Sequence, residues 1–321
     1  MFTDMPLEQL RTYRGAVPEP EDFDSFWDET LAQARAAGGE VVVESVATPK
    51  LRGIDLYDVT FPGFDGEPIK AWLRVPSGLD APVPAVVQYV GYGGGRGYPA
   101  QELFYPAAGF VHLHMDSRGQ GSGWTVGDTP DQSPSGPQVP GVMTKGILDP
   151  RGYYYRRLIT DAVRAVDAAA GLGCVDESRI AVVGGSQGGA LALAAGALSP
   201  LVRAVAAHVP FLCDFQRAIG VTNERPFAEL TAYLACHRDQ EDAVFRTLSY
   251  IDGVNFAKRA HAPGRIAVAL MDAVVPPSTV FAAYNAYAAP KDLQIWRHNG
   301  HESGGHLDDL AALDFFTRVV G

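Results

Sequence analysis

Three side chains of this sequence have the types and the chain order that nucleophilic acyl chemistry needs. Ser186 lies in the motif GGSQG at residues 184–188, Asp272 follows an apolar run, and His301 lies in a later loop. A serine hydroxyl is a weak nucleophile at neutral pH, so it needs a base within hydrogen-bonding reach and a carboxylate that holds this base in one tautomer. The order predicts Ser186 as nucleophile, His301 as general base and Asp272 as the residue that orients the base.

The segments on either side of Ser186 fit this role. An apolar run, RIAVVGGS, precedes the serine, and an alanine- and leucine-rich helical segment, QGGALALAAGAL, follows it. A turn this tight from strand to helix strains the serine backbone, and glycines two residues before and after remove side chains that would collide. A glycine-rich turn without chemistry is the alternative. A phosphate-binding loop is disfavoured because its Lys-Ser/Thr pair is missing.

The acid and the base each have competitors. Asp272 has the alternative role of capping the helix expected after the two prolines at 276–277. His298 and His306 flank His301 in the segment WRHNGHESGGH. We expect His298 to lie on or just past the last strand and His306 to lie in the terminal helix, so the loop position of His301 suits the base best.

Two backbone amides are candidates for stabilising the oxyanion of acyl transfer. Gln187 begins the helix after the nucleophile, where free N–H groups and the positive end of the helix dipole face the serine. The second donor in such sites comes from the loop after an earlier central strand. Here that loop is the glycine run GYGGGRG at residues 91–97. It predicts the Tyr92 N–H as the second donor.

A metal site is a rival interpretation of the segment HLHMD at residues 112–116. Two imidazoles on one strand face with a carboxylate beyond them resemble part of a zinc site, but zinc needs three or four convergent ligands, and no partner stands at a recognisable spacing. Packing or loop-anchoring roles therefore fit His112 and His114 better, and we expect no metal and no cofactor. We expect Arg118 to hold the following loop in place.

The elements that must position these residues change character along the chain. The first 40 residues include an amphipathic helix with Phe23, Phe26, Trp27 and Leu31 on one face. Runs at 41–48, 54–63 and 67–76 predict an antiparallel meander. Short apolar runs then alternate with helical segments, as in parallel βα units. These runs lie at 84–91, 109–116, 179–186, 201–210, 265–272 and 293–300.

We expect one α/β domain over residues 1–321, with a mostly parallel central sheet and helices on both faces. An N-terminal extension covers about residues 1–40, and a helical cap inserts at about 214–260 between two strands. Residues 117–152, rich in Gly, Pro, Ser and Asp, predict a long loop of the kind that is functional or disordered. Three cysteines, Cys174, Cys213 and Cys236, predict buried free thiols.

Charge and hydropathy restrict the partners. The formal net charge is −11, which disfavours binding to nucleic acid or to anionic lipid surfaces. The sequence contains neither a signal-peptide pattern near its start nor an uninterrupted apolar run of ~18 residues. We therefore expect a cytoplasmic protein that acts on a small molecule, without a membrane or nucleic-acid partner.

Several motifs together resemble one family. The segments GYGGGRG, DSRGQGSGW, GGSQGG, DAVVPPSTVFAAYN and the closing GHE are similar to those of acetyl xylan esterases that also act as cephalosporin C deacetylases, carbohydrate esterase family seven of the α/β-hydrolase superfamily. The resemblance spans essentially the whole chain. It implies a triad of Ser186, Asp272 and His301, oxyanion donors at Tyr92 and Gln187, an intracellular homohexamer, no metal, and small acetylated substrates.

The sequence departs from this family after the aspartate, where residues 273–275 are Ala-Val-Val instead of a polar or cysteine-containing run. The 122–152 loop also carries Trp124, so acyl and leaving-group preferences stay open. A serine amidase or peptidase on the same fold is an alternative, although no additional peptide-binding domain is visible. A non-catalytic binding protein that keeps the fold is a third possibility.

Overall fold

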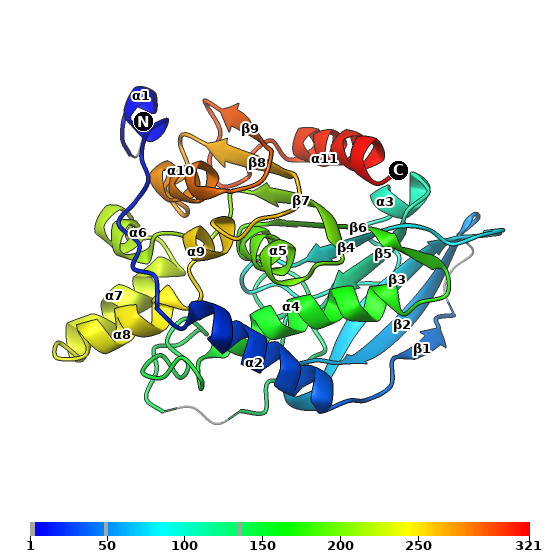
Figure 1. Cartoon of the computed structure of the whole chain (residues 1–321), viewed down its shortest axis with the longest axis horizontal. Coiled ribbons are helices and arrows are strands. Elements are labelled where there is room, and N and C mark those ends of the chain that lie inside the picture. The colour runs from blue at the N-terminus through cyan, green and yellow to red at the C-terminus, as the bar shows by residue number, and fades with distance from the viewer. Residues whose placement is uncertain (1–3, 48–50, 134–135) are drawn as a thin grey trace.

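A nine-stranded mixed sheet forms the centre of the protein (Figure 1). The computed structural model describes residues 4–47, 51–133 and 136–321. The strands are β1 (Val42–Ser45), β2 (Ile54–Pro62), β3 (Pro68–Pro76), β4 (Val83–Tyr89), β5 (Val111–Met115), β6 (Val175–Gly185), β7 (Val202–His208), β8 (Gly264–Ala269) and β9 (Lys291–Trp296). Their order in the sheet is β1-β2-β3-β5-β4-β6-β7-β8-β9. Each run that the sequence marks as a strand overlaps one, although β4, β6, β8 and β9 begin one to four residues earlier than predicted, and residue 48 of the first run lies outside the described residues.

The two halves of the sheet differ in direction, as the sequence predicts. β1, β2 and β3 pair antiparallel, and β3 joins β5 antiparallel. The strands from β4 and β5 to β9 then pair parallel. Because parallel neighbours end at the same edge, the loops after β4, β6, β8 and β9 meet there. Those four loops carry the candidate site residues.

Helices cover both faces of the sheet. On one face lie α4 (Tyr154–Ala170), α5 (Gln187–Leu198) and α10 (Pro277–Ala286), with α2 (Phe23–Ala36) packed on α4. On the other face lie α3 (Phe104–Ala107) and α11 (His306–Val319), whose apolar residues pack on the sheet in a separate cluster. None of the helices in the described part of the chain is long and apolar enough to cross a lipid bilayer.

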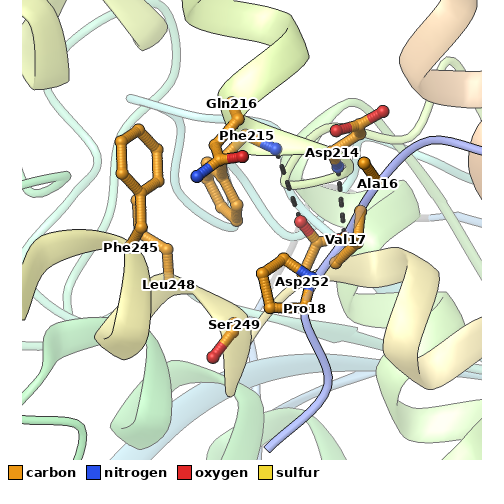
Figure 2. A pocket seen from close by; sticks show the side chains of 10 residues that line it. All are labelled: Ala16, Val17, Pro18, Asp214, Phe215, Gln216, Phe245, Leu248, Ser249 and Asp252. Atoms are coloured by element: carbon orange, nitrogen blue, oxygen red, sulfur yellow. Dashed lines mark hydrogen bonds between the residues drawn. The ribbon is translucent and has the colours of Figure 1, made fainter. Parts of the chain in front are cut away.

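The N-terminal segment crosses the body and joins it to the helices around residues 214–260. It contains α1 (Leu7–Leu10) and α2. The Ser278 N–H donates to the Asp4 carboxylate (2.7 Å), and the Tyr13 hydroxyl donates to Asp214 (2.8 Å). Beside this crossing, the buried Asp252 carboxylate accepts from the Asp214 and Phe215 N–H groups (Figure 2). The expected N-terminal helix is present, and its four apolar residues are buried.

Four helices fill the expected insertion between β7 and β8. They are α6 (Phe215–Val221), α7 (Phe227–Cys236), α8 (Glu241–Ser249) and α9 (Gly253–Ala257). Cys236 at the end of α7 is exposed and Cys174 is only half-buried, so the prediction that all three thiols are buried is confirmed for Cys213 alone. The apolar neighbours of Cys236, Leu230 and Tyr233, lie on the buried face of the helix instead.

The long loop between β5 and α4 has no helix or strand among its described residues; positions 134–135 lie outside them. Ion pairs fix it. The buried Arg118 guanidinium donates two hydrogen bonds to Asp161 of α4 (2.6 and 2.8 Å) and also contacts Glu67 and Asp131. Asp131 lies within the loop, so Arg118 holds it as expected.

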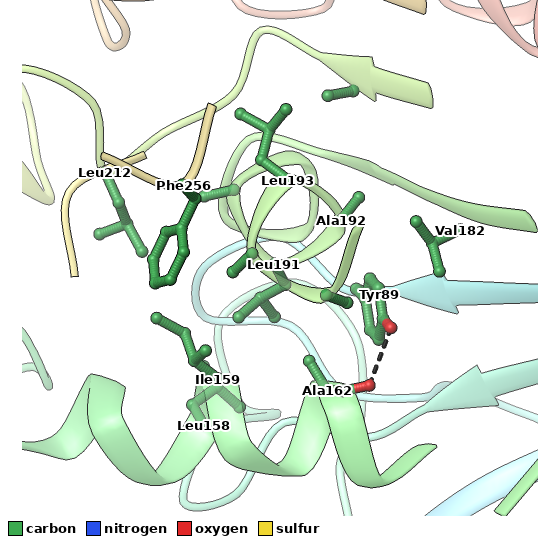
Figure 3. Packing of buried hydrophobic residues seen from close by; sticks show 14 of the residues in the cluster. Tyr89, Leu158, Ile159, Ala162, Val182, Leu191, Ala192, Leu193, Leu212 and Phe256 are labelled. Atoms are coloured by element: carbon green, nitrogen blue, oxygen red, sulfur yellow. Dashed lines mark hydrogen bonds between the residues drawn. The ribbon is translucent and has the colours of Figure 1, made fainter. Parts of the chain in front are cut away.

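α5 is the central helix of the core (Figure 3). Its apolar side chains, among them Leu191 and Leu193, pack against α4 and against the sheet, and they are almost completely buried. The Tyr89 hydroxyl at the end of β4 donates to the Ala162 carbonyl of α4 at 2.9 Å. A helix packed this densely on both sides fixes the position of its first residue, which follows Ser186 directly.

Candidate active site

Ser186 occupies the turn between β6 and α5 with a positive φ, at φ 55° and ψ −119°. A non-glycine residue at positive φ is strained and persists only where its surroundings hold it. The flanking glycines explain how the turn closes. A Cβ on Gly184 would lie 2.3 Å from the Gly188 backbone carbon, and a Cβ on Gly188 would lie 2.3 Å from the Tyr89 carbonyl oxygen. The expected nucleophile turn is therefore present.

The three predicted residues meet in one hydrogen-bonded chain. His301 Nε2 lies 3.1 Å from Ser186 Oγ, and His301 Nδ1 lies 2.8 Å from Asp272 Oδ2. With its proton on Nδ1, the imidazole donates to the carboxylate and accepts from the serine hydroxyl. This geometry is the one that allows an imidazole to take a proton from serine.

Asp272 lies beyond its strand and not at the strand end that the sequence suggests. β8 ends at Ala269, and residues after it turn back over the sheet edge. The other carboxylate oxygen of Asp272 accepts from the Val274 and Val275 N–H groups at 2.8 and 2.9 Å. The carboxylate thus shapes its own turn. It does not cap α10, which begins at Pro277 after Pro276.

The competing histidines have other surroundings. His298 is exposed just after β9. His306 is the first residue of α11, 3.9 Å from Asp309 and in ring contact with Phe104. Only His301 of these three is hydrogen bonded to Ser186 among the described residues.

The structure also shows how the two candidate oxyanion residues are held. Gln187 is the first residue of α5, so its N–H has no partner within the helix. Tyr92 lies in the loop after β4, where its hydroxyl donates to Glu229 (2.7 Å) and accepts from the Val142 N–H (2.8 Å). The role of both amides as donors to an oxyanion stays a prediction.

Glu229 of α7 is a residue that the sequence analysis did not single out. It is 2% exposed and accepts from both the Tyr92 hydroxyl and the Met143 N–H. Burial raises the pKa of the Glu229 carboxyl, while the hydrogen bond from Tyr92 acts in the opposite direction. This carboxyl therefore joins the loop after β4, the long loop and α7.

Gln120 is a second residue whose function the sequence analysis left open. Its Oε1 accepts from the Gly93 N–H at 2.6 Å, and its Nε2 donates to Gln187 Oε1 at 2.9 Å and to the Tyr154 hydroxyl at 2.8 Å. One side chain thus links the two segments that carry the candidate oxyanion amides. Its place in the DSRGQGSGW motif was the available signal.

Two cavities border the triad. The larger has a volume of about 680 Å³, and a smaller one of about 240 Å³ lies against Ser186, His208 and Asp308. The larger is lined by Ser186 and His301, by residues 88–92, 95–97 and 101–102, and by His114, Trp124, Thr125, Gly185, Arg225, Pro226 and Val274. Trp124 is exposed and donates to the Tyr92 carbonyl at 2.8 Å. The volume is in the range of small-molecule sites.

Two of the three residues of the rival metal site, Asp116 and His112, have other partners. Asp116 accepts from the N–H groups of Arg96, Ser117 and Asp128. His112 lies 2.9 Å from Gln88 Oε1 and 3.4 Å from the Arg74 guanidinium. Within residues 4–47, 51–133 and 136–321, no group of three or more His, Cys, Asp or Glu side chains could hold a metal ion.

A family model described as acetyl xylan esterase (AXE1) matches residues 1–319. The chain belongs to the acetyl xylan esterase family. It is 40% identical to the acetyl xylan esterase from Paenibacillus sp. R4, with a TM-score of 0.93 over 98% of this chain and 100% of that one. It is 34% identical to acetyl xylan esterase 1 from Thermoanaerobacterium sp. JW/SL YS485, with a TM-score of 0.92 over 99% and 100% of the chains.

A curated member of this family is longer. Acetyl esterase Axe7A of Xylanibacter ruminicola is 30% identical over 300 residues, which are 92% of this chain but 65% of that protein. The predicted α/β-hydrolase fold is confirmed by the mixed nine-stranded sheet and by these structural neighbours.

Proposed function

We propose that this protein is a serine esterase that removes acetyl groups from small acetylated sugars. The observation that carries the proposal is the hydrogen-bonded chain from Ser186 through His301 to the buried Asp272. Membership of the acetyl xylan esterase family supports the acetyl ester as substrate. The cavity of about 680 Å³ that borders the nucleophile has room for a sugar ring beside an acetyl group.

The reaction has two steps. Ser186 Oγ attacks the acetyl carbonyl carbon while His301 Nε2 takes its proton, and the imidazolium then protonates the departing sugar oxygen. Water, deprotonated by the same imidazole, attacks the acyl-enzyme and releases acetate. Asp272 stabilises the imidazolium, and the Tyr92 and Gln187 amides stabilise the oxyanion of each tetrahedral intermediate.

Initial hydrolysis rates of matched acetyl, butyryl and octanoyl esters of one chromogenic alcohol test this function, with Ser186→Ala as the blank for each. We expect a steep preference for the acetyl ester that vanishes in the variant. Acetylated xylo-oligosaccharides and cephalosporin C are then the substrates to compare. Retained turnover in Ser186→Ala would refute the serine mechanism, and a preference for longer acyl chains would refute the deacetylase.

We also infer that the protein assembles as a homohexamer and works in the cytoplasm. The similarity of its motifs to those of carbohydrate esterase family seven supports both. Light scattering of the purified protein tests the assembly, and a mass other than six times 34.3 kDa contradicts it. Fractionation of the producing cells tests the location.

A further inference from the structure

His114 is a buried side chain without a hydrogen-bond partner in the part of the chain that the structure describes. It lies near the carboxyl end of β5, is 6% exposed, and lines the larger cavity. Its Nδ1 is completely buried and has no hydrogen-bond partner among the described residues, so the Nε2 side of the ring is the side that faces the cavity. An unpaired buried polar group lowers stability unless a ligand or water satisfies it.

Three other polar side chains line the same cavity, and we name the four together the His114 corner: Gln88, Gln101, Glu102 and His114. Gln88 Oε1 is occupied by His112 and Gln101 Oε1 by the Tyr98 N–H. Within the described residues, the two amide NH₂ groups and the Glu102 carboxylate form no hydrogen bond. The corner therefore offers amide donors, a carboxylate acceptor and an imidazole.

The charges around the corner select the chemistry of its ligand. Burial, together with the facing guanidinium groups of Arg74 and Arg96, lowers the pKa of His114 to about 3, so the ring is neutral at neutral pH. With Nδ1 buried, Nε2 is the ring nitrogen within reach of a ligand, and it donates or accepts one hydrogen bond according to the tautomer, as a hydroxyl group does either. The Arg96 guanidinium is paired with Asp58 and Asp128, and the Glu102 carboxylate accepts from hydroxyls. A neutral polyhydroxylated ligand fits this set.

We propose that the His114 corner binds free hydroxyl groups of the leaving alcohol and thereby makes the enzyme select sugar esters over simple alkyl esters. The corner and the Ser186–His301 pair line one continuous cavity, so one substrate reaches both. This inference rests on the proposed function. His114 is in this sense a specificity-determining residue, because it contacts the alcohol and not the reacting atoms.

The test compares two acetyl esters, mono-acetylated xylobiose and ethyl acetate, whose alcohol has no further hydroxyl. The measured quantity is the ratio of their kcat/KM values, from acetate release, because a folding defect lowers both values by one factor and leaves their ratio unchanged. We expect His114→Phe to lower this ratio about tenfold, since it removes both ring nitrogens at nearly constant volume. Glu102→Ala, at an exposed side chain, is expected to lower it about threefold.

Thr247→Val is the matched control. Thr247 lies on α8, is fully buried, and its hydroxyl, like His114 Nδ1, has no hydrogen-bond partner among the described residues, but it does not line the cavity. The ratio for Thr247→Val should stay within twofold of the parent value. An unchanged ratio in both His114→Phe and Glu102→Ala overturns the inference, as does an equal fall in Thr247→Val. If His114→Phe does not fold, Glu102→Ala decides. Failure of the parent protein to hydrolyse either ester instead refutes the proposed function.

Discussion

Replacing Tyr92 by phenylalanine tests whether a side chain on one wall of the site holds its own backbone amide in place. The substitution removes one hydroxyl and leaves the Glu229 carboxyl and the Val142 N–H without their partner. Each unsatisfied group costs about 1–3 kcal/mol. Tyr92 lines the cavity, so water can satisfy part of this loss. We therefore expect the free energy of unfolding to fall by roughly 2–4 kcal/mol.

The effect on catalysis should be separable from this loss of stability. Removing an oxyanion donor lowers kcat by about 10²–10³, and Tyr92→Phe displaces the donor without deleting it. We therefore expect kcat for an acetyl ester to fall about tenfold and KM to change less than twofold. The reason is that the oxyanion forms in the transition state and the tetrahedral intermediate but not in the bound substrate. Denaturant unfolding and steady-state kinetics of the same preparation measure both quantities.

Tyr233→Phe is the matched control for this experiment. Tyr233 is a buried tyrosine on α7, the helix of Glu229, and its hydroxyl donates to Gln240 at 2.7 Å. This variant should lose about 1 kcal/mol of stability and keep the parent kcat. If Tyr92→Phe loses the expected stability but retains kcat within twofold, the hydroxyl does not position the amide and the reasoning is wrong.

Three further perturbations have defined outcomes. Gln120→Leu removes the bridge between the two oxyanion segments, so kcat should fall at least ~10-fold and stability by roughly 2–3 kcal/mol; parent-like kinetics would contradict the bridging role. Gly184→Ala brings a Cβ to 2.3 Å from the Gly188 backbone, so labelling of Ser186 by a fluorophosphonate should slow more than ~100-fold, and a parent-like rate would show that the turn tolerates the methyl group. Burial raises the pKa of Asp252 from 3.8 to about 7, so the folded state holds a proton that the unfolded chain has released, and stability falls as pH rises across this interval. In Asp252→Asn, the free energy of unfolding should fall by a few kcal/mol less between pH 4 and pH 8 than in the parent protein. An unchanged pH dependence would show that other groups cause it.

The residues of the triad were predictable because their signals are local. Ser186 lies in a short motif whose strand, glycines and helix are contiguous in the sequence, and the chain order of acid and base restricts the remaining choice. The end of β8 was harder to predict from the sequence. Its last three expected residues leave the strand because Asp272 accepts from amides that follow it, and such a turn depends on a side chain rather than on apolar periodicity.

The supporting contacts could not be predicted in the same way. Glu229 and Tyr92 are separated by 137 residues, and no periodic pattern relates a position on α7 to the loop after β4. Gln120 lies within a recognisable motif, but its partners become evident only when β4 is known to lie between β5 and β6. A lone histidine on a strand, such as His114, is ambiguous until the cavity beside it is known.

The crossing of the N-terminal segment over the helices at residues 214–260 has a consequence for the order of folding during synthesis. Tyr13 bonds to a carboxylate 201 residues later, and Asp4 to an amide 274 residues later. At about 5–20 residues per second, the ribosome delivers the first of these partners on the order of 10 to 40 s after Tyr13. This segment must therefore wait for its binding surface, and in a growing cell it is exposed to proteases and chaperones for that interval.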